Sequence, residues 1–117
     1  GVSVLTSLKE LDTLALFGNS LHDQIVNLFK IAKKTNLDGI VCSPLELEIA
    51  KNILNPNSIK ITPGIRDIKV EDDQARTMSA KRAIEHGASF LVIGRPITQA
   101  ADILKELKNF NHLIYGY

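Results

Sequence analysis

The chain is poor in several residue types that mark particular classes of protein. It has no tryptophan, aromatic residues make up 5%, and Cys42 is the one cysteine in 117 residues. A single cysteine forms no internal disulfide, so we expect a reducing compartment and a cytoplasmic location. The few aromatics and the formal net charge of +1 argue against base stacking and a strongly basic field, so nucleic acid is not an expected partner.

Long apolar runs are also missing. No stretch approaches the roughly 20 apolar residues of a membrane-spanning helix, and Gly1–Thr6 lacks the pattern of a secretory leader. We therefore expect no membrane partner. What is present is an ordinary globular composition, with 44% hydrophobic and 23% charged residues. The length suits a single domain that spans residues 1–117.

Four short apolar segments are typical of buried parallel strands. They are Val2–Leu5, Gly39–Cys42, Ile59–Thr62 and Phe90–Ile93. The second and fourth are nearly continuous apolar runs, which suits strands that are covered on both faces. Each segment is followed by hydroxyl residues, proline or glycine, where a turn is expected.

Helical patterns begin between these segments. Apolar residues recur at helical spacing over residues 21–34, and a minor helical turn is expected over Glu10–Leu16. Ser43–Glu46 reads Ser-Pro-Leu-Glu, a capping box with proline at the first helical position. It predicts a helix that continues through about Leu54, where Asn55–Asn57 ends it.

Two more helices are expected in the second half of the chain. Ser79 caps one that runs to His86, with Gly87 as its C-terminal stop. Thr98 caps the last helix. Its inward-facing residues are expected to be Ala100, Ile103, Leu104 and Leu107.

The expected order is four strand–helix units. This alternation predicts right-handed crossovers and a parallel sheet. Two α/β architectures fit: a small open doubly wound sheet, or part of a (β/α)8 barrel. A complete barrel takes about 250 residues and eight units, so four units are half of one. In both architectures ligands bind beyond the carboxyl ends of the strands.

Small hydroxyl residues, glycines and arginines gather at these expected strand ends. They are Thr6–Ser7, Ser43, Thr62–Arg66 and Gly94–Pro96. A backbone N–H at Gly94 or Arg95 beside a guanidinium makes an anion site. Each of these residues is also an ordinary turn or cap residue, and that second interpretation stays open.

Five segments together resemble the orotidine 5'-phosphate decarboxylase family in its bacterial form. They are Val4–Ser7, Leu37–Ser43, Thr62–Arg66 (Thr-Pro-Gly-Ile-Arg), Asp73–Arg76 and Val92–Gln99 (Val-Ile-Gly-Arg-Pro-Ile-Thr-Gln). The resemblance implies the C-terminal half of a TIM (β/α)8 barrel, with four βα units and parallel strands. It also implies a carboxy-lyase of pyrimidine biosynthesis that converts orotidine to uridine 5'-monophosphate without a cofactor.

The resemblance assigns six residues to substrate binding. Thr6 lines the pocket, Ser43 hydrogen-bonds the pyrimidine ring, and Arg66 contacts the ligand. Gln74 bridges the base and the phosphate, while Gly94 and Arg95 bind the 5'-phosphate through a backbone N–H and a guanidinium.

Catalytic residues are not expected in this chain. The family's Asp-x-Lys-x-x-Asp motif belongs to an early strand, whereas the resemblance here begins at the fifth. Asp67–Asp72 fits the bare pattern, but it lies in a charged loop after Arg66, so we interpret it as a solvated loop. Cys42 is interpreted as an inert buried thiol, and the three histidines show no metal-ligand spacing.

Half a barrel is incomplete alone. Its inward side chains face a missing half, and Val2–Leu5 and Phe90–Ile93 become exposed edges. We therefore expect a homo-oligomer or a complementary N-terminal half as partner. For function we expect binding of orotidine or uridine 5'-monophosphate without decarboxylation by this chain alone. The alternative is a non-catalytic remnant or assembly module that keeps the fold without a ligand.

Overall fold

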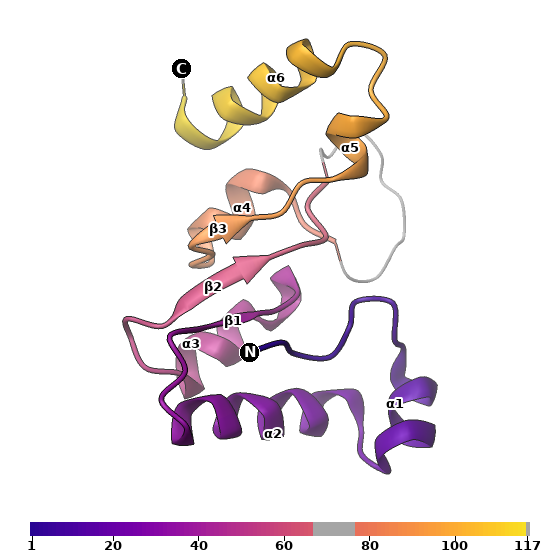
Figure 1. Cartoon of the computed structure of the whole chain (residues 1–117), viewed down its shortest axis with the longest axis vertical. Helices are drawn as coiled ribbons and strands as arrows, with labels where there is room; N and C mark the ends of the chain where they lie inside the picture. The colour runs from indigo at the N-terminus through magenta and orange to yellow at the C-terminus, as the bar shows by residue number, and fades with distance from the viewer. Residues whose placement is uncertain (67–76, 117) are drawn as a thin grey trace.

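A computed structural model describes residues 1–66 and 77–116, which form an α/β fold around three parallel strands (Figure 1). Strands β1 (Gly39–Val41), β2 (Ile59–Thr62) and β3 (Phe90–Leu91) lie side by side in that order. The register pairs Val41 with Ile61 and Ile61 with Phe90. Because all three strands run in one direction, their carboxyl termini lie at the same end of the sheet.

Residues 1–4 extend the sheet beyond β1. Val2 forms a parallel bridge with Val41, and the Ser3 N–H donates to the Val41 carbonyl at 2.8 Å. The expected strand Val2–Leu5 is therefore reduced to one bridge. Among the described residues, this segment pairs only with β1. A turn in which the Leu8 N–H donates to the Leu5 carbonyl ends the pairing. The expected strand at Phe90–Ile93 is likewise shortened to Phe90–Leu91.

Two helices connect residues 1–4 to β1. The second, α2 (Leu21–Lys34), has the bounds that the sequence predicted. Ser20 caps it, because its Oγ accepts from the Asp23 N–H at 3.0 Å. The first, α1 (Glu10–Phe17), confirms the minor helical turn and ends at Gly18, whose φ of 71° suits glycine.

After β1 the chain enters a 3-10 turn over Pro44–Glu46 and then α3 (Leu47–Ile53). The Ser43 N–H donates to Glu46 Oε2 at 3.2 Å, which is one half of the predicted capping box. The Glu46 N–H donates to the Ser43 carbonyl at 3.0 Å, a bond between residues three apart, and Ser43 Oγ makes no hydrogen bond with a described residue. The predicted helix therefore starts as a tighter turn.

After β2 and the segment that follows it, α4 (Ala80–Glu85) confirms the third predicted helix. Ser79 Oγ accepts from the Arg82 N–H at 3.3 Å, which satisfies one free donor at the helix start. Gly87 follows the helix with a φ of 98°, a conformation that side chains rarely adopt.

The last helix differs from the prediction. Thr98 does not cap it but ends α5 (Arg95–Thr98), and α6 (Ile103–Tyr115) begins five residues further on. Asp102 caps α6, because its Oδ1 accepts from the Lys105 N–H at 3.0 Å. A carboxylate also complements the positive end of the helix dipole, an advantage that a threonine lacks.

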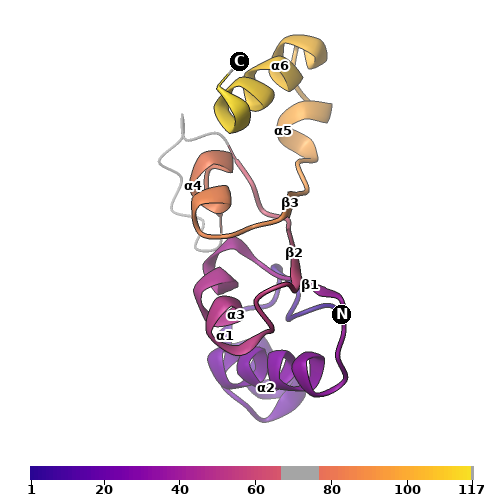
Figure 2. The same cartoon turned by 90° about the vertical axis from the view of Figure 1, so that its left-hand side faces the viewer.

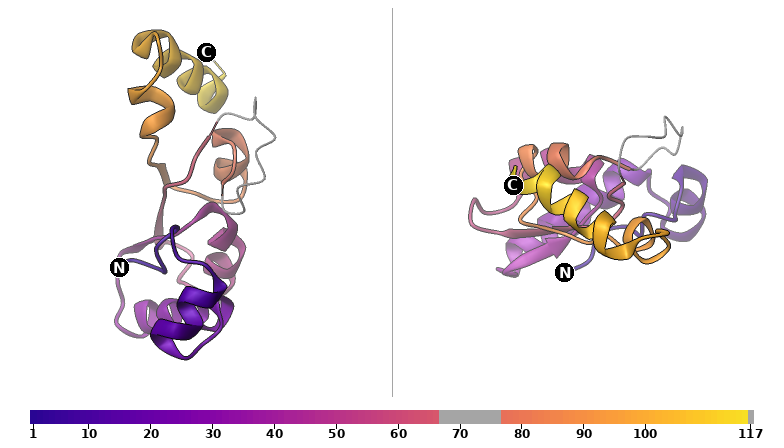
Figure 3. Two further views of the ribbon diagram at one scale, coloured as in Figure 1. Left: turned by 90° about the vertical axis from the view of Figure 1, so that its right-hand side faces the viewer. Right: turned by 90° about the horizontal axis from the view of Figure 1, so that it is seen from above.

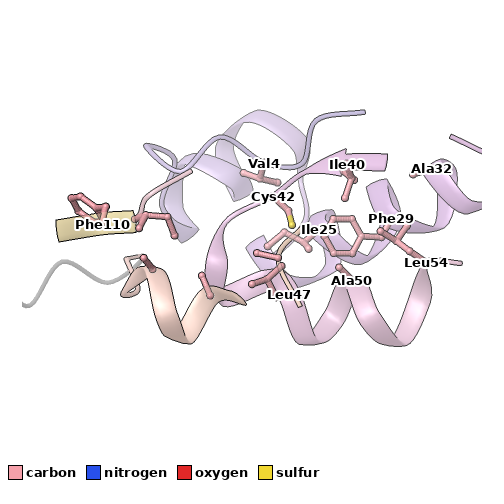
Figure 4. Packing of buried hydrophobic residues seen from close by; sticks show 14 residues of the cluster. Val4, Ile25, Phe29, Ala32, Ile40, Cys42, Leu47, Ala50, Leu54 and Phe110 are labelled. Carbon is pink, nitrogen blue, oxygen red and sulfur yellow. The ribbon is translucent and has the colours of Figure 1, made fainter. Parts of the chain in front are cut away.

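Helices α2, α3 and α4 cover one face of the sheet (Figure 2). Phe29 of α2 and Leu47 of α3 are fully buried at 0% exposure and pack around Ile40 and Cys42 (Figure 4). Phe110 of α6 is 1% exposed and lies apart from this group. The core is thus a sheet-on-helix layer with a smaller contact at the C-terminal helix.

The other face of the sheet carries no helix of the described chain, as Figure 3 shows from a further side. Side chains alternate along a strand, so the register places Val2, Ile59 and Phe90 on this face together. They are 59%, 40% and 60% exposed, and Val92, two residues past Phe90, is 50% exposed. Large apolar side chains therefore face solvent where a folded domain usually buries them.

The predicted inward residues of the last helix share this exposure. Ile103, Leu104 and Leu107 are 51%, 71% and 42% exposed, so the prediction that they face inward was wrong, as was the helical placement of Ala100. The helix buries Phe110 instead. It packs against α4 and α5, and no described residue buries the three exposed side chains.

Cys42 lies under this helical layer at 2% exposure. Burial raises the pKa of its thiol from 9.0 to about 12; the nearby Glu46 carboxylate also raises it, and Lys60 lowers it. A thiol that stays protonated is a poor nucleophile.

We expect Phe29→Ala to lower the free energy of unfolding by about 3–5 kcal/mol, because a fully buried ring is lost. Leu11→Ala is the control, since Leu11 of α1 is 79% exposed, and it should cost less than about 0.5 kcal/mol. Urea unfolding followed by circular dichroism measures both. Equal losses would contradict this assignment of the core.

The Cys42 thiol should not react with an aromatic disulfide reagent in the native protein near neutral pH, and should react once urea unfolds the chain. Stability should also fall as pH rises from 9.0 towards about 12, because the unfolded thiol ionises first. Cys42→Ala should reduce that fall. Rapid labelling of the native thiol is the result that would contradict its burial.

Candidate functional site

Four segments leave the sheet at the same end, where the strands have their carboxyl termini. Ser43 comes two residues after β1, Pro63 directly follows β2, and Val92 directly follows β3. Residues 1–4 run parallel to β1, so Thr6 emerges there as well. In Figure 1 this end of the sheet is the one to which the strand arrows point. The clustering of polar strand-end residues expected from the sequence thus follows from the parallel register.

Arg66 stands at a hydrogen-bonded junction beyond β2. Its N–H donates to the Met78 carbonyl at 3.1 Å, and the Met78 N–H donates to the Gly64 carbonyl at 3.3 Å. Ile65, at 2% exposure, anchors the junction in the core. Arg66 itself is half-buried. The predicted ligand residue Gln74 and the Asp67–Asp72 segment lie outside the described residues.

Gly94 and Arg95 form the turn from β3 into α5. The Gly94 carbonyl accepts from the N–H groups of Ile97 and Thr98 at 2.9 and 3.0 Å, which fixes the turn. The N–H groups of Gly94 and Arg95 donate to no other residue that the structure describes. A Cβ at Gly94 would meet no atom within 4 Å, and Arg95 is exposed. Within the described part of the chain, the backbone at Gly94 and the side chain of Arg95 are therefore accessible from solvent.

Ser43 and Thr6 differ in accessibility. Thr6 is exposed in the turn after residues 1–4, whereas Ser43 is 1% exposed. Within residues 1–66 and 77–116, the hydroxyls of Ser3, Ser43 and Thr62 are buried without a hydrogen-bond partner. An unpaired buried hydroxyl costs about 1–3 kcal/mol. Ser3 was missed in the sequence, because Val-Ser-Val reads simply as alternation in a strand.

Metal and membrane sites find no support in the described part of the chain. No group of three or more His, Cys, Asp or Glu residues is placed there to hold a metal ion. His86 instead pairs its Nδ1 with Glu48 Oε1 at 3.1 Å on the surface. No helix over residues 1–66 or 77–116 is both long enough and apolar enough to cross a membrane.

A cleft of about 480 Å³ lies between α4 and α6. Its lining includes Lys81, Glu85, His112 and Tyr115 but none of the described residues predicted to bind substrate. It is formed by helices rather than by the loops after the strands, so it is separate from the candidate site.

The sequence was compared with protein-family models and with curated proteins, and both comparisons match one family. The sequence model of the orotidine 5'-phosphate decarboxylase / HUMPS family matches residues 1–110. Orotidine 5'-phosphate decarboxylase of Glaesserella parasuis is 46% identical over 116 residues, which are 97% of this chain and 50% of that protein. The enzyme of Dictyoglomus thermophilum is 42% identical over 117 residues, covering 97% of this chain and 48% of its own length. The chain therefore spans about half the length of these curated relatives.

Solved structures agree with the sequences. Orotidine 5'-phosphate decarboxylase from Lactobacillus acidophilus superposes with a TM-score of 0.77 at 32% identity, over 97% of this chain and 47% of that one. The Pyrococcus horikoshii enzyme, at 19% identity and a TM-score of 0.64, shares the fold. These relatives are (β/α)8 barrels, and the parallel strands of this chain match half of one. The chain belongs to the orotidine 5'-phosphate decarboxylase / HUMPS family.

Proposed function

We propose that this chain is the substrate-binding half of an orotidine 5'-phosphate decarboxylase, a cofactor-independent enzyme of pyrimidine biosynthesis in the cytoplasm. The family match over residues 1–110 carries the proposal, because the matched relatives are named for this activity. The chain spans about half of those relatives, and the residues that resemble the family's substrate-binding positions give this half the proposed role of recognising the phosphate and the pyrimidine.

Gly94 and Arg95 are the proposed phosphate site. A planar guanidinium pairs with two phosphate oxygens at once, and a backbone N–H adds a third, uncharged donor. The exposure of Arg95 and the lack of a described acceptor for either N–H support this role. Both groups are positioned by the turn that Gly94 forms with Ile97 and Thr98.

The remaining proposed contacts surround the nucleoside. Thr6 is exposed at the same carboxyl end of the sheet. Arg66 is half-buried at the junction after β2, and the segment that carries Gln74 follows it in the sequence. Ser43 is proposed to hydrogen-bond the pyrimidine, which its unpaired Oγ favours. Because Ser43 is 1% exposed, the ring can reach it only if the residues that cover it move aside.

Binding alone does not decarboxylate the substrate. The resemblance places the lysine and aspartates that handle the carboxylate and the proton on an early strand, outside the half that this chain matches. Binding energy from a remote phosphate lowers the barrier only where it positions the ring against such groups. We therefore propose that activity requires a complementary amino-terminal half, and that the chain associates with that half or with itself.

We expect uridine 5'-monophosphate to bind the chain, and Arg95→Ala to weaken binding by about 10- to 100-fold, because a charge-assisted contact worth about 1.5–3 kcal/mol is lost. Arg82→Ala is the matched control, since it removes an exposed arginine from α4 and should leave affinity unchanged. Isothermal titration measures both. Absence of binding by the unmodified chain would favour the non-catalytic remnant.

The isolated chain should convert orotidine 5'-monophosphate no faster than the uncatalysed reaction, because the proton-handling groups are missing. The absorbance change of the pyrimidine follows the conversion. Lys69→Ala should leave this background unchanged, which tests whether the Asp67–Asp72 pattern has a catalytic role. Enzyme-like turnover that disappears with Lys69→Ala would overturn both the assignment of that segment and the proposed division of labour.

A further inference from the structure

We propose that Glu46 is a positioning residue for pyrimidine recognition, because it holds the backbone of Ser43 and thereby keeps the Ser43 hydroxyl available to the ring. The inference deepens the proposed function and rests on it, since Ser43 is the residue proposed above to hydrogen-bond the pyrimidine. Glu46 is not among the six residues that the resemblance assigns to substrate binding.

Glu46 places a buried carboxylate in the turn after β1. It is 2% exposed, and its neighbours Pro44 and Leu47 are buried as well. Its charge acts on the Cys42 thiol, whose pKa it raises, so the carboxylate lies close to the end of β1. A buried charge lowers stability unless hydrogen bonds compensate it. Hydrogen bonds that need this carboxylate are therefore expected in the turn.

Both backbone polar groups of Ser43 are bonded to Glu46. The Ser43 N–H donates to Glu46 Oε2 at 3.2 Å, and the Ser43 carbonyl accepts from the Glu46 N–H at 3.0 Å. The second bond occupies the N–H from which the hydroxyl of a capping serine usually accepts. Pro44, the residue between them at the start of the turn, has no N–H to offer. Glu46 thus fixes the Ser43 backbone without engaging the Ser43 hydroxyl.

The other two serine caps of the described helices do use their hydroxyls. Ser20 Oγ accepts from the Asp23 N–H at 3.0 Å, and Ser79 Oγ accepts from the Arg82 N–H at 3.3 Å. Ser43 Oγ has no hydrogen-bond partner among the described residues, although it is buried. A buried hydroxyl without a partner is unfavourable, and a ligand that supplies one removes this cost. Because a hydroxyl both donates and accepts, it suits the carbonyl oxygens and the ring N–H of a uracil base.

A purely structural role for Glu46 would have a different signature. A carboxylate that only stabilises the turn would affect every ligand of the chain equally. A carboxylate that positions Ser43 affects contacts to the pyrimidine, whereas the phosphate contacts are proposed at Gly94 and Arg95. Ribose 5-phosphate carries the phosphate without the base, so its binding separates the two roles.

Isothermal titration with uridine 5'-monophosphate and with ribose 5-phosphate tests the proposal. Glu46→Ala should weaken nucleotide binding at least about fivefold and change ribose 5-phosphate binding by less than about twofold. Glu46→Gln keeps an acceptor oxygen and should restore nucleotide binding to within about twofold of the unmodified chain. Glu48→Ala is the matched control, because it removes an exposed glutamate from α3 and should leave both affinities unchanged.

A double substitution tests whether Glu46 acts through Ser43. Ser43→Ala combined with Glu46→Ala should bind the nucleotide no more weakly than Ser43→Ala alone, because both substitutions remove one contact. Circular dichroism shows whether each variant keeps its helices. Nuclear magnetic resonance of the unmodified chain needs no variant to fold: the amide signals of Ser43 and Glu46 should shift with the nucleotide and stay in place with ribose 5-phosphate.

Four results would overturn the role of Glu46 while the nucleotide still binds the unmodified chain. They are equal losses of both ligands in Glu46→Ala, no recovery in Glu46→Gln, additive losses in the double variant, and amide signals that ignore the base. If the unmodified chain binds neither ligand, the proposed function fails and this inference fails with it. If Glu46→Ala does not fold, the amide signals of the unmodified chain and the recovery in Glu46→Gln decide.

Discussion

The parallel hydrogen-bonded register of residues 1–4, β1, β2 and β3 determines the rest of this structure. It brings the carboxyl ends of four strand segments to one end of the sheet. Thr6, Ser43, Arg66 and Arg95 therefore lie at that end although they come from distant parts of the sequence. The same register places every second side chain on a face that no described helix covers. The candidate site and this apolar face are thus two consequences of a single arrangement of strands.

Local signals in the sequence were reliable where one segment alone decides its conformation. For α2, a Ser20 cap and a buried side of Ile25, Phe29 and Ala32 lie within one continuous segment, and its predicted bounds were right. The last helix was harder, because Thr98 and Asp102 both have capping side chains. The choice between them depends on where α5 begins and ends, and its first turn is formed around Gly94 rather than at Thr98.

Packing partners were less predictable than the elements themselves. The spacing of Ile103, Leu104 and Leu107 correctly indicates a helix with an apolar side, but periodicity does not say what covers that side. The site shows the same limit. The sequence placed Ser43 at a strand end, and that place is right, yet a place at a strand end does not predict that the side chain is 1% exposed.

A half barrel separates two requirements that a complete enzyme combines. Phosphate recognition needs only a short turn with a guanidinium and free backbone donors, and the proposed site at the β3–α5 turn would supply both from adjacent residues. Carbanion chemistry needs a lysine and carboxylates held within fractions of an ångström by a closed barrel wall. Any apolar surface of matching shape can bury the sheet face that no described helix covers, whereas under the proposed function decarboxylation also needs the Asp-x-Lys-x-x-Asp strand that the resemblance places outside the matched half. Stability and catalysis therefore make different demands on the proposed partner.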